Sequence, residues 1–368
     1  MPIRRLQISG VRNLQPLSLT PALGVNFIYG ENGSGKSSLL EALHILATGK
    51  SFRHHLLKPV IQHDMDECVL FSEIEDNRLG TGRLGVRRSR NGEKAIKLNG
   101  EALHSQAEAS SWLPVQIIEP NTFKLLSGSP QERRQFIDWG VFHVEHSFLD
   151  QWREFKKLLQ QRNAVLKKQQ PDWLDVWDKG FVKAANAVNE SRKAYIERLL
   201  PVFQHTLSRL DANLDVQLSF YPGWERKSDL IDILHKQRER DLQIGHTQSG
   251  PQRAELRIKV DNMNAADILS RGQQKAVVAA LKLSQGVLFQ QETGRSTIYL
   301  VDDLASELDE KHRFALCQLL EDLKCQVFIT SIEHSSISDQ WQPEGCKMFH
   351  VEQGHISDKT PARLTSIY

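Results

Sequence analysis

The sequence has few cysteines and no long apolar run. Its four cysteines, Cys68, Cys317, Cys325 and Cys346, are widely spaced and form no C-x-x-C pair. They therefore predict reduced thiols in the cytosol rather than a disulfide framework or a zinc site. No run of about 18 apolar residues occurs, and the N-terminal segment 1–6 lacks the apolar stretch of a secretion signal. These absences predict a soluble cytoplasmic protein without a membrane span.

An excess of charge of one sign is also missing. The chain carries 47 Lys and Arg against 45 Asp and Glu, a formal net charge of +2. Any surface that binds nucleic acid must therefore be a local patch. The apolar content of 40% and the charged content of 25% are typical of a globular protein. A length of 368 residues favours two domains, or one large domain with an insertion.

The most informative motif is the segment 30–37, GENGSGKS, which fits the phosphate-binding pattern G-x-x-x-x-G-K-[ST]. The apolar segment 24–29 before it predicts a buried strand, and leucines at helical spacing follow it as far as Gly49. A glycine loop between a strand and a helix turns backbone N–H groups toward a phosphate, and the helix dipole favours the anion. The sequence therefore predicts an ATP site that contains Gly30, Asn32, Gly33, Ser34, Gly35, Lys36, Ser37 and Ser38.

Within this motif, Lys36 is expected to contact the β- and γ-phosphates, and Ser37 to bind Mg²⁺. A second element of the same site lies far downstream, where the apolar segment 298–301 ends in Asp302 and Asp303. This pattern is typical of a Walker B strand. Asp302 is then predicted to hold Mg²⁺ through its hydration shell, and Asp303 to activate the attacking water as general base. Lys36 and Asp303 are thus the predicted catalytic residues.

Two further segments complete a set of ATPase motifs. The segment 269–275, LSRGQQK, precedes an apolar helix, so the Ser270 hydroxyl and the Gly272 N–H would lie at a helix start, a common anion site. The segment 305–309, ASELD, directly follows the Walker B strand. Both resemble the signature motif and the D-loop of ABC-type ATPases, in which the signature of one subunit covers the γ-phosphate bound by the other. The resemblance implies an ATP-dependent homodimer, released by hydrolysis. The residues it implies for nucleotide binding are Ser270, Gly272, Gln273 and Asp309, of which Ser270 and Asp309 would act across the interface.

The order of these motifs predicts an α/β fold with a P-loop NTPase head of the ABC/SMC type, built from both chain ends, and a mainly helical inserted lobe. We assign residues 1–127 to the N-terminal part of the head, 128–243 to the lobe and 244–368 to the C-terminal part of the head. Apolar residues at 3- and 4-residue steps predict the lobe helices, at Phe148, Trp152, Phe155 and Leu159 and at Trp173, Trp177, Phe181, Ala184 and Val188. We interpret this aromatic stripe as helix-bundle core rather than as a base-stacking surface.

Other segments carry a more specific likeness. They are 3–14, which includes Val11-Arg12-Asn13-Leu14, and 46–53, 128–134, 250–253 and 269–275. Together they resemble the RecF family of bacterial recombination mediators, which are ABC-type ATPases related to SMC heads. The resemblance implies that Arg12 and Asn13 help to bind nucleotide. The chain departs from the family pattern at Gln252, where His is usual, and at the expected Q-loop segment 119–122, EPNT, where Pro-Glu-Asp is usual.

The resemblance also implies a function. It suggests an ATP-dependent DNA-binding protein of recombinational repair and replication restart, with ATP and Mg²⁺ as cofactors and a weak, DNA-stimulated ATPase activity. Its implied partners are duplex or gapped DNA, including junctions of single and double strands, and the proteins RecO and RecR, with which it would help to load the RecA recombinase.

A basic hairpin is the strongest candidate for a DNA-binding surface. Its turn is predicted at Asn91-Gly92, and it carries a single acid, Glu93, against Arg78, Arg83, Arg87, Arg88, Arg90, Lys94 and Lys97. We expect the phosphate contacts at Arg83, Arg87, Arg88, Arg90 and Lys94, with recognition of the backbone rather than of base edges. The alternative is an edge hairpin whose charges only prevent aggregation. A second basic set in the lobe is more typical of a solvated helix face, at Lys156, Lys157, Arg162, Lys167 and Lys168.

Two other functions remain open. Asp303 is one methylene shorter than the Glu usual in fast ABC ATPases, so the protein could be an SMC-like DNA clamp or scaffold that uses ATP mainly as a structural ligand. A third hypothesis, the motor subunit of a membrane transporter, is weaker. Those subunits usually carry a switch His after the last strand, where Thr330-Ser331 stand here, with His334 further along.

Overall fold

The computed structural model describes residues 2–54, 56–120, 123–304, 308–332 and 345–361. The chain divides into two compact units, which are unit 1 with Met1–Thr122, Arg209–Asp211 and Ala279–Tyr368, and unit 2 with Phe123–Ser208 and Ala212–Val278. Both ends of the chain therefore contribute to unit 1. The segment 244–278, which the sequence analysis assigned to the head, groups with unit 2 instead.

An antiparallel sheet of unit 1 has the strand order β2-β1-β4-β5-β6-β7. Its strands are β1 (Ile3–Ser9), β2 (Leu17–Leu19), β4 (Glu67–Asp76), β5 (Gly80–Ser89), β6 (Lys94–Leu98) and β7 (Glu101–Ala102). Along β5, buried residues such as Leu84 and Val86 alternate with exposed ones such as Arg83 and Arg87. One face of this sheet therefore packs on the core, and the other face is exposed.

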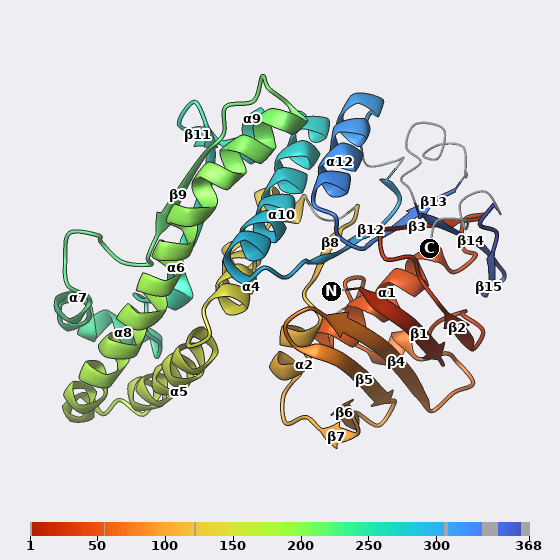
Figure 1. Cartoon of the computed structure of the whole chain (residues 1–368). Coiled ribbons are helices and arrows are strands. Elements are labelled where there is room, and N and C mark those ends of the chain that lie inside the picture. Colours follow the sequence, from red (N-terminus) through yellow and green to blue (C-terminus); the bar gives the residue numbers. More distant parts are fainter. Residues whose placement is uncertain (1, 55, 121–122, 305–307, 333–344, 362–368) are drawn as a thin grey trace. The chain divides into compact units, whose positions relative to one another are not determined.

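The second sheet of unit 1 positions the nucleotide motifs. Its order is β15-β14-β3-β13-β12-β8, and its pairs are parallel except β14 with β15. The strands are β3 (Val25–Tyr29), β8 (Val115–Ile118), β12 (Ile298–Val301), β13 (Val327–Ser331), β14 (Lys347–Glu352) and β15 (His355–Asp358). Every residue of β12 and β13 is buried, as expected for parallel strands covered on both faces. Because β3, β13 and β12 are adjacent, their carboxyl ends meet at one edge (Figure 1).

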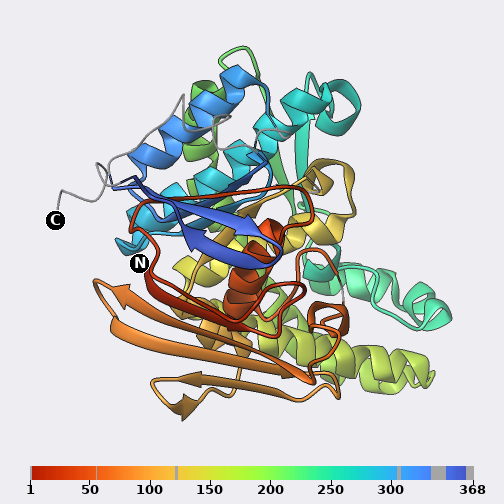
Figure 2. The same cartoon turned by 90° about the vertical axis from the view of Figure 1, so that its right-hand side faces the viewer.

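The helices of unit 1 are α1 (Lys36–Thr48), α2 (Gln106–Trp112), α12 (Glu310–Asp322), the C-terminal part of α10 (Arg271–Thr293) and the 3-10 helix Lys58–Val60. α1 lies between the two sheets (Figure 2). Its leucines, Leu39, Leu40, Leu43 and Leu46, are fully buried. α1 ends where Gly49 takes a left-handed conformation and its N–H donates to the Ile45 carbonyl, as the sequence predicted.

Unit 2 is mainly helical but also contains a small sheet. Its helices are α3 (Lys124–Ser127), α4 (Pro130–Val144), α5 (Phe148–Lys167), α6 (Leu174–Leu210), α7 (Leu230–Lys236), α8 (Arg238–Ile244), α9 (Ala265–Ile268) and the start of α10, with 3-10 helices at Pro171–Trp173 and Pro251–Arg253. The sheet has the order β11-β10-β9 and consists of β9 (Gln217–Tyr221), β10 (Glu255–Val260) and β11 (Met263–Asn264). Because β10 pairs with β9, the segment after residue 244 belongs to this unit.

The predicted aromatic stripe is largely core. Phe148, Phe155 and Phe181 are buried, and the rings of Phe155 and Phe181 lie 5.8 Å apart. Trp173 is different, because it belongs to the 3-10 turn before α6 and is 59% exposed. The helical period therefore begins only after this residue.

Two glycines inside helices of unit 2 give a test of core packing. A Cβ at Gly140 in α4 would lie 2.1 Å from the ring of the buried Tyr195, whereas a Cβ at Gly180 in α6 would meet Leu158 at 3.5 Å, an ordinary contact. We expect Gly140→Ala to lower the free energy of unfolding by about 1–3 kcal/mol through overpacking. Gly180→Ala should raise it by about 0.5–1 kcal/mol, because Ala favours a helix. Urea unfolding measures both, and a Gly140→Ala variant as stable as Gly180→Ala would contradict this packing.

Candidate nucleotide-binding site

The glycine loop between β3 and α1 contains backbone dihedral angles that residues with a Cβ rarely adopt. Gly30 has a φ of 150°, and a Cβ there would lie 2.2 Å from the Val351 carbonyl oxygen. Gly33 has a φ of 79°, and a Cβ there would meet nothing within 4 Å. The first glycine thus allows close packing on β14, and the second leaves the inside of the loop open.

Lys36 begins α1 and lies over this loop. Its Nζ donates to the carbonyl oxygens of Gly30 and Glu31 at 2.7 and 2.9 Å. Burial lowers the pKa of Lys36, and the carboxylates of Asp303 and Asp302 oppose the shift. The cation is therefore held beside the glycine loop and faces the carboxylates at the end of β12.

Asp302 is the acceptor on which several segments converge. Its Oδ1 accepts hydrogen bonds from Ser37 Oγ at 2.9 Å and from Thr330 Oγ1 at 2.7 Å. Burial raises the pKa of Asp302, while the bonds from Thr330 and Ser37 oppose this rise. A carboxylate and a hydroxyl side by side form the hard oxygen donor set that suits Mg²⁺. The residues present therefore fit the predicted metal.

Asp303 follows with an unusual backbone. Its φ is 52°, in the left-handed region that non-glycine residues rarely adopt, and its N–H donates to Thr330 Oγ1 at 2.8 Å. Thr330 thus positions both acids, with one bond to the side chain of Asp302 and one from the backbone of Asp303. The motif pattern alone did not assign this role to Thr330.

Arg12 and Asn13 support the loop from the end of β1. Asn13 Nδ2 donates to the Gly33 carbonyl at 2.9 Å, and Ser38 Oγ donates to Asn13 Oδ1 at 3.1 Å. Arg12 forms a bidentate pair with the fully buried Glu41 of α1, with both bonds at 2.9 Å. The sequence analysis did not identify Glu41, which orients the predicted nucleotide-binding arginine.

These groups line one cavity of about 430 Å³ within unit 1. It is lined by Arg12, Asn13, Asn32, Gly33, Gly35, Lys36, Ser37, Ser38, Arg53, Asp302, Asp303, Thr330 and Ile332. Most of the predicted P-loop and Walker B residues therefore meet around one space. Gly30 and Ser34 are buried behind the lining, and Arg53, Thr330 and Ile332 are additions that the motifs did not predict.

The predicted signature residues lie at the exposed start of α10. The Ser270 N–H donates to Gln273 Oε1 at 2.9 Å, and the Gln273 N–H donates to Ser270 Oγ at 3.3 Å, which is a capping box. A Cβ at Gly272 would meet nothing within 4 Å, so the backbone there is accessible. These residues belong to unit 2, and their predicted action across a dimer stays a prediction.

Of the predicted D-loop, residues 305–307 lie outside the described residues. Asp309 caps α12, because its Oδ1 accepts from the His312 N–H at 2.9 Å. Asn121, in the expected Q-loop, and His334 also lie outside the described residues. Gln252, at the position where the family usually has His, donates to the carbonyls of Thr247 and Ser249 and so closes a turn within unit 2.

The basic hairpin corrects part of the DNA-binding prediction. Arg88 is 7% exposed, because strand alternation turns it inward, where it donates to Gln106. Arg90 donates to four backbone carbonyls of the segment 61–65 and so holds that loop. The guanidinium of Arg88 is therefore buried, and that of half-buried Arg90 is engaged by backbone carbonyls. Lys94 is exposed but lies on the face opposite to Arg83 and Arg87, because it pairs with Arg88.

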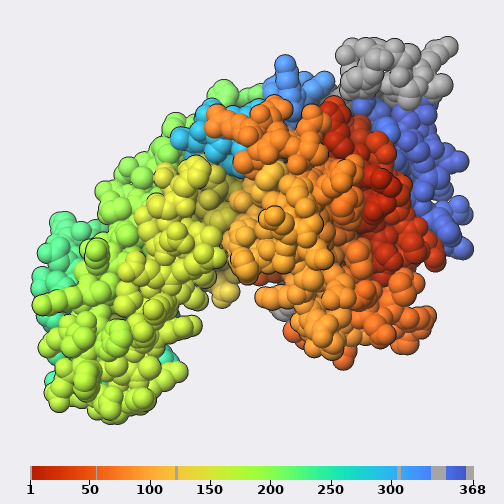
Figure 3. Space-filling view, turned by 60° about the horizontal axis from the view of Figure 1, so that its bottom comes forward, coloured from red at the N-terminus to blue at the C-terminus, as the bar shows by residue number. Residues whose placement is uncertain are grey.

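Of the predicted phosphate contacts, Arg83 and Arg87 lie together on the exposed face of the sheet. Their contact with DNA stays a prediction. Figure 3 shows in orange the surface to which this part of the chain contributes.

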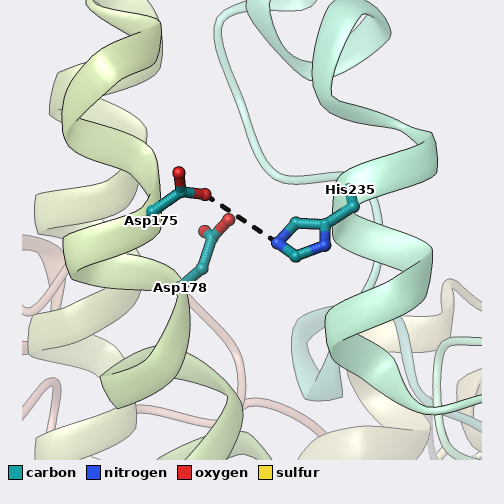
Figure 4. Close-up of side chains that lie close together, drawn as sticks. All are labelled: Asp175, Asp178 and His235. Atoms are coloured by element: carbon teal, nitrogen blue, oxygen red, sulfur yellow. Dashed lines mark ion pairs between the residues drawn. The ribbon is translucent and has the colours of Figure 1, made fainter.

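A second group of possible metal ligands lies in unit 2. Asp175, Asp178 and His235 bring one ligand atom each within 4.8 Å of one another (Figure 4). However, Arg238 pairs with both carboxylates, and the fully buried Arg162 donates to Asp178 Oδ1 at 2.7 Å. Because these cations already neutralise the acids, we interpret the group as an ion-pair network that joins α5, α6, α7 and α8.

The fold and the cavity together define a P-loop ATPase of the ABC/SMC type. A family model described as the RecF/RecN/SMC N-terminal domain matches residues 2–357. The DNA replication and repair protein RecF of Pseudomonas putida (strain GB-1) is 48% identical over 360 residues, which cover 97% of this chain and 98% of that protein. RecF of Pseudomonas entomophila (strain L48) gives the same values. The chain therefore belongs to the RecF family of DNA replication and repair proteins, as its motifs predicted.

Solved structures agree. The recombination mediator protein RecF bound to ATP, from the RecFOR pathway, has a TM-score of 0.86 at 26% identity and covers 97% of both chains. A second solved structure, of the recombination mediator protein RecF-ATPrS in the RecFOR pathway, has a TM-score of 0.85 at 26% identity over 98% of both chains. An SMC head bound to the C-winged helix domain of ScpA has a TM-score of 0.61 at 14% identity, which supports the fold alone. Within the described helices, none is both long and apolar enough to cross a bilayer.

The Arg12–Glu41 pair gives a prediction about acid stability. Burial disfavours ionised Glu41, but hydrogen bonds from Arg12 and Ser51 prevail and lower its pKa. A lowered folded-state pKa stabilises the fold above the unfolded-state pKa of about 4.3, and this contribution is lost as the pH falls further, through the folded-state pKa. Glu41→Gln breaks the pair with Arg12 and should therefore lose about 3–5 kcal/mol of unfolding free energy at pH 7.

The difference from the wild type should stay constant above about pH 5 and shrink below about pH 4.3. Denaturant unfolding between pH 7 and pH 3 measures it, with Glu101→Gln on exposed β7 as the control. A difference that does not change with pH would show that the charge of Glu41 is not the stabilising feature.

Proposed function

We propose that the protein is an ATP-dependent DNA-binding protein of recombinational repair and replication restart, which dimerises on ATP and hydrolyses it slowly with stimulation by DNA. One observation carries this proposal. The cavity at the carboxyl ends of β3, β13 and β12 brings Lys36 and Ser37 together with Asp302 and Asp303. The family membership supports the same reading.

Each residue has a definite part in the proposed chemistry. Lys36 neutralises charge on the β- and γ-phosphates, Asn13 holds the glycine loop, and Arg12 lines the cavity. Ser37 and Asp302 would hold Mg²⁺, which supplies neutralisation and alignment of the phosphate oxygens when bound. Asp303 accepts a proton from the attacking water and orients it. Its φ of 52° fixes where its carboxylate can reach.

None of the described residues that line this cavity belongs to the predicted signature segment 269–275. The exposed helix start at Ser270 and Gly272 suits the role of covering the γ-phosphate, because N–H groups and a hydroxyl at a helix N-terminus bind anions. We infer that a second copy supplies it and that Asp309 acts across the same interface. Hydrolysis would remove the shared anion and release the two copies.

The proposed partners are duplex or gapped DNA and the proteins RecO and RecR, with which the protein would help to load RecA. Exposed Arg83 and Arg87 are our candidate phosphate contacts, and recognition there would follow the backbone and fall steeply with salt. The relatives are named as DNA replication and repair proteins, and the solved relatives belong to the RecFOR pathway.

The dimer is tested at the proposed signature. Ser270→Arg should bind ATP as tightly as the wild type, because Ser270 does not line the cavity of its own chain, yet it should stay monomeric. Sedimentation with ATP and Mg²⁺ measures the association. Ser208→Arg makes the same change at an exposed helical position and serves as the control. Wild-type dimerisation of Ser270→Arg would rule out its action across the interface.

The chemistry is tested at Asp303. Asp303→Asn removes the proposed base, so DNA-stimulated turnover should fall by about 100-fold or more while ATP binding persists. Single-turnover hydrolysis measures this, with exposed Asp64→Asn as the control. Turnover within a few-fold of the wild type would contradict the role.

A second candidate function, a DNA clamp in which ATP is a structural ligand, is favoured by the short Asp303 side chain. It predicts that the same Asp303→Asn variant loses turnover but still complements repair after ultraviolet damage in deficient cells. Loss of both activities supports the enzyme instead.

A further inference from the structure

The exposed face of the antiparallel sheet in unit 1 carries a depression that the nucleotide site does not use. Its volume is about 660 Å³, within the range of about 300–1,000 Å³ common for ligand sites. It is lined by Phe71, Thr81, Arg83, Gly85, Lys97, Asn99 and Gly100, which come from β4, β5, β6 and the turn after β6.

The floor of the depression is formed by Phe71 and by Gly85, which has no side chain. Phe71 is half-buried and lies directly opposite Gly85 in the ladder, and Gly85 lies opposite Lys97 on the other side. A Cβ at Gly85 would meet nothing within 4 Å, and its backbone is not in the left-handed region. The gap therefore does not result from a backbone requirement for glycine, and it leaves the space beside the Phe71 ring open.

The rim of the depression is cationic. The Arg83 side chain is 69% exposed, and its ion pair with Glu73, at 3.7 Å, is the exposed kind that contributes little. Lys97 is exposed and has no ion pair among the described residues. Asn99 fixes the backbone of Arg83, because its Oδ1 accepts from the Arg83 N–H at 2.8 Å and its own N–H donates to the Arg83 carbonyl at 2.9 Å.

We propose that this depression binds one unpaired nucleotide of DNA, with its base against Phe71 over Gly85 and its phosphates at Arg83 and Lys97. The inference rests on the proposed DNA-binding function and deepens it. An aromatic side chain beside cationic groups is the combination by which proteins bind single strands, since every base has a π-face and every nucleotide a phosphate.

An extended peptide fits the depression less well. Peptides that add to a sheet need the free edge of a strand. Here β5 is hydrogen-bonded to β4 on one side and to β6 on the other, so the centre of the depression offers no edge. Stacking on Phe71 would also make the exposed face prefer unpaired DNA to duplex, a preference that Arg83 and Arg87 alone cannot provide. Phosphate contacts bind duplex and single strands alike, whereas a ring on the floor can stack only on a base that has left the helix.

The test compares two variants that change the floor in opposite ways. Phe71→Ala removes the ring, and Gly85→Leu adds a side chain to the gap, where its Cβ would meet no atom within 4 Å. Binding is measured by anisotropy, with ATP and Mg²⁺, on a gapped duplex and on a blunt duplex of equal length. Both variants should bind gapped DNA about 5- to 100-fold more weakly and blunt duplex almost as the wild type does. A 2-aminopurine placed in the gap should be quenched by the wild type only.

Controls separate the floor from the rest of the face. Val69→Ala removes an exposed apolar side chain, 42% exposed on the same face of β4, and should leave gapped DNA binding unchanged. Thermal unfolding checks that each variant is folded. Lys97→Gln should lower the slope of log affinity against log salt on gapped DNA by about 0.7, the value for one lost phosphate contact on a single strand.

The outcomes are distinguishable. If both floor variants bind gapped DNA like the wild type, or weaken blunt duplex equally, the nucleotide site is wrong while the DNA-binding function stands. If they bind DNA normally but lose RecO or RecR, the depression is a protein-docking site and the proposal is overturned. If the wild type binds no DNA with ATP, the proposed function itself fails and this inference fails with it.

Discussion

The carboxylate of Asp302 is the contact on which the nucleotide site depends. Its hydrogen bonds from Ser37 and Thr330 join the start of α1 to the ends of β12 and β13, and the Ser37 bond spans 265 residues of sequence. Backbone pairing places these segments in order, but only the side-chain bonds fix how far the glycine loop lies from the acids. A buried carboxylate is costly unless it is hydrogen-bonded. The same burial that raises its pKa therefore makes the two hydroxyl donors necessary, and it favours a cation at this point.

Buried charged side chains are compensated differently in the two units. In unit 1, Lys36 and Asp302 face a cavity, so they can exchange protein partners for a ligand. In unit 2, Arg162 is fully buried and donates to Asp178 and Asp241 as well as to Thr247. Such a network gives geometric specificity to helix packing rather than much net stability. Charged side chains that face a cavity thus form a binding site in unit 1, whereas the buried ion pairs of unit 2 hold helices together.

Sequence reasoning was most accurate where a motif is local. The glycine loop, Lys36, Ser37 and the strand that ends in Asp302 and Asp303 could be identified because their chemistry depends on spacing along one segment. Glu41 and Thr330 were not identified as site residues. Glu41 acts by orienting Arg12 from the second turn of α1, and Thr330, noted only as standing where a switch His is usual, acts from the neighbouring strand. Both become visible only when helices and strands are packed.

The basic hairpin shows the same division. The Asn91-Gly92 turn and the local charge predicted a positively charged antiparallel pair, but they could not separate Arg87 from Arg88, because one residue along a strand reverses the face. The sequence by itself determined the ATPase class, the order of its motifs and the family. The tertiary structure decided which cations remain exposed, that Thr330 joins Ser37 at the carboxylate of Asp302, and that the segment after residue 244 joins the helical unit. Those properties depend on pairing and burial between distant segments, which no local pattern specifies.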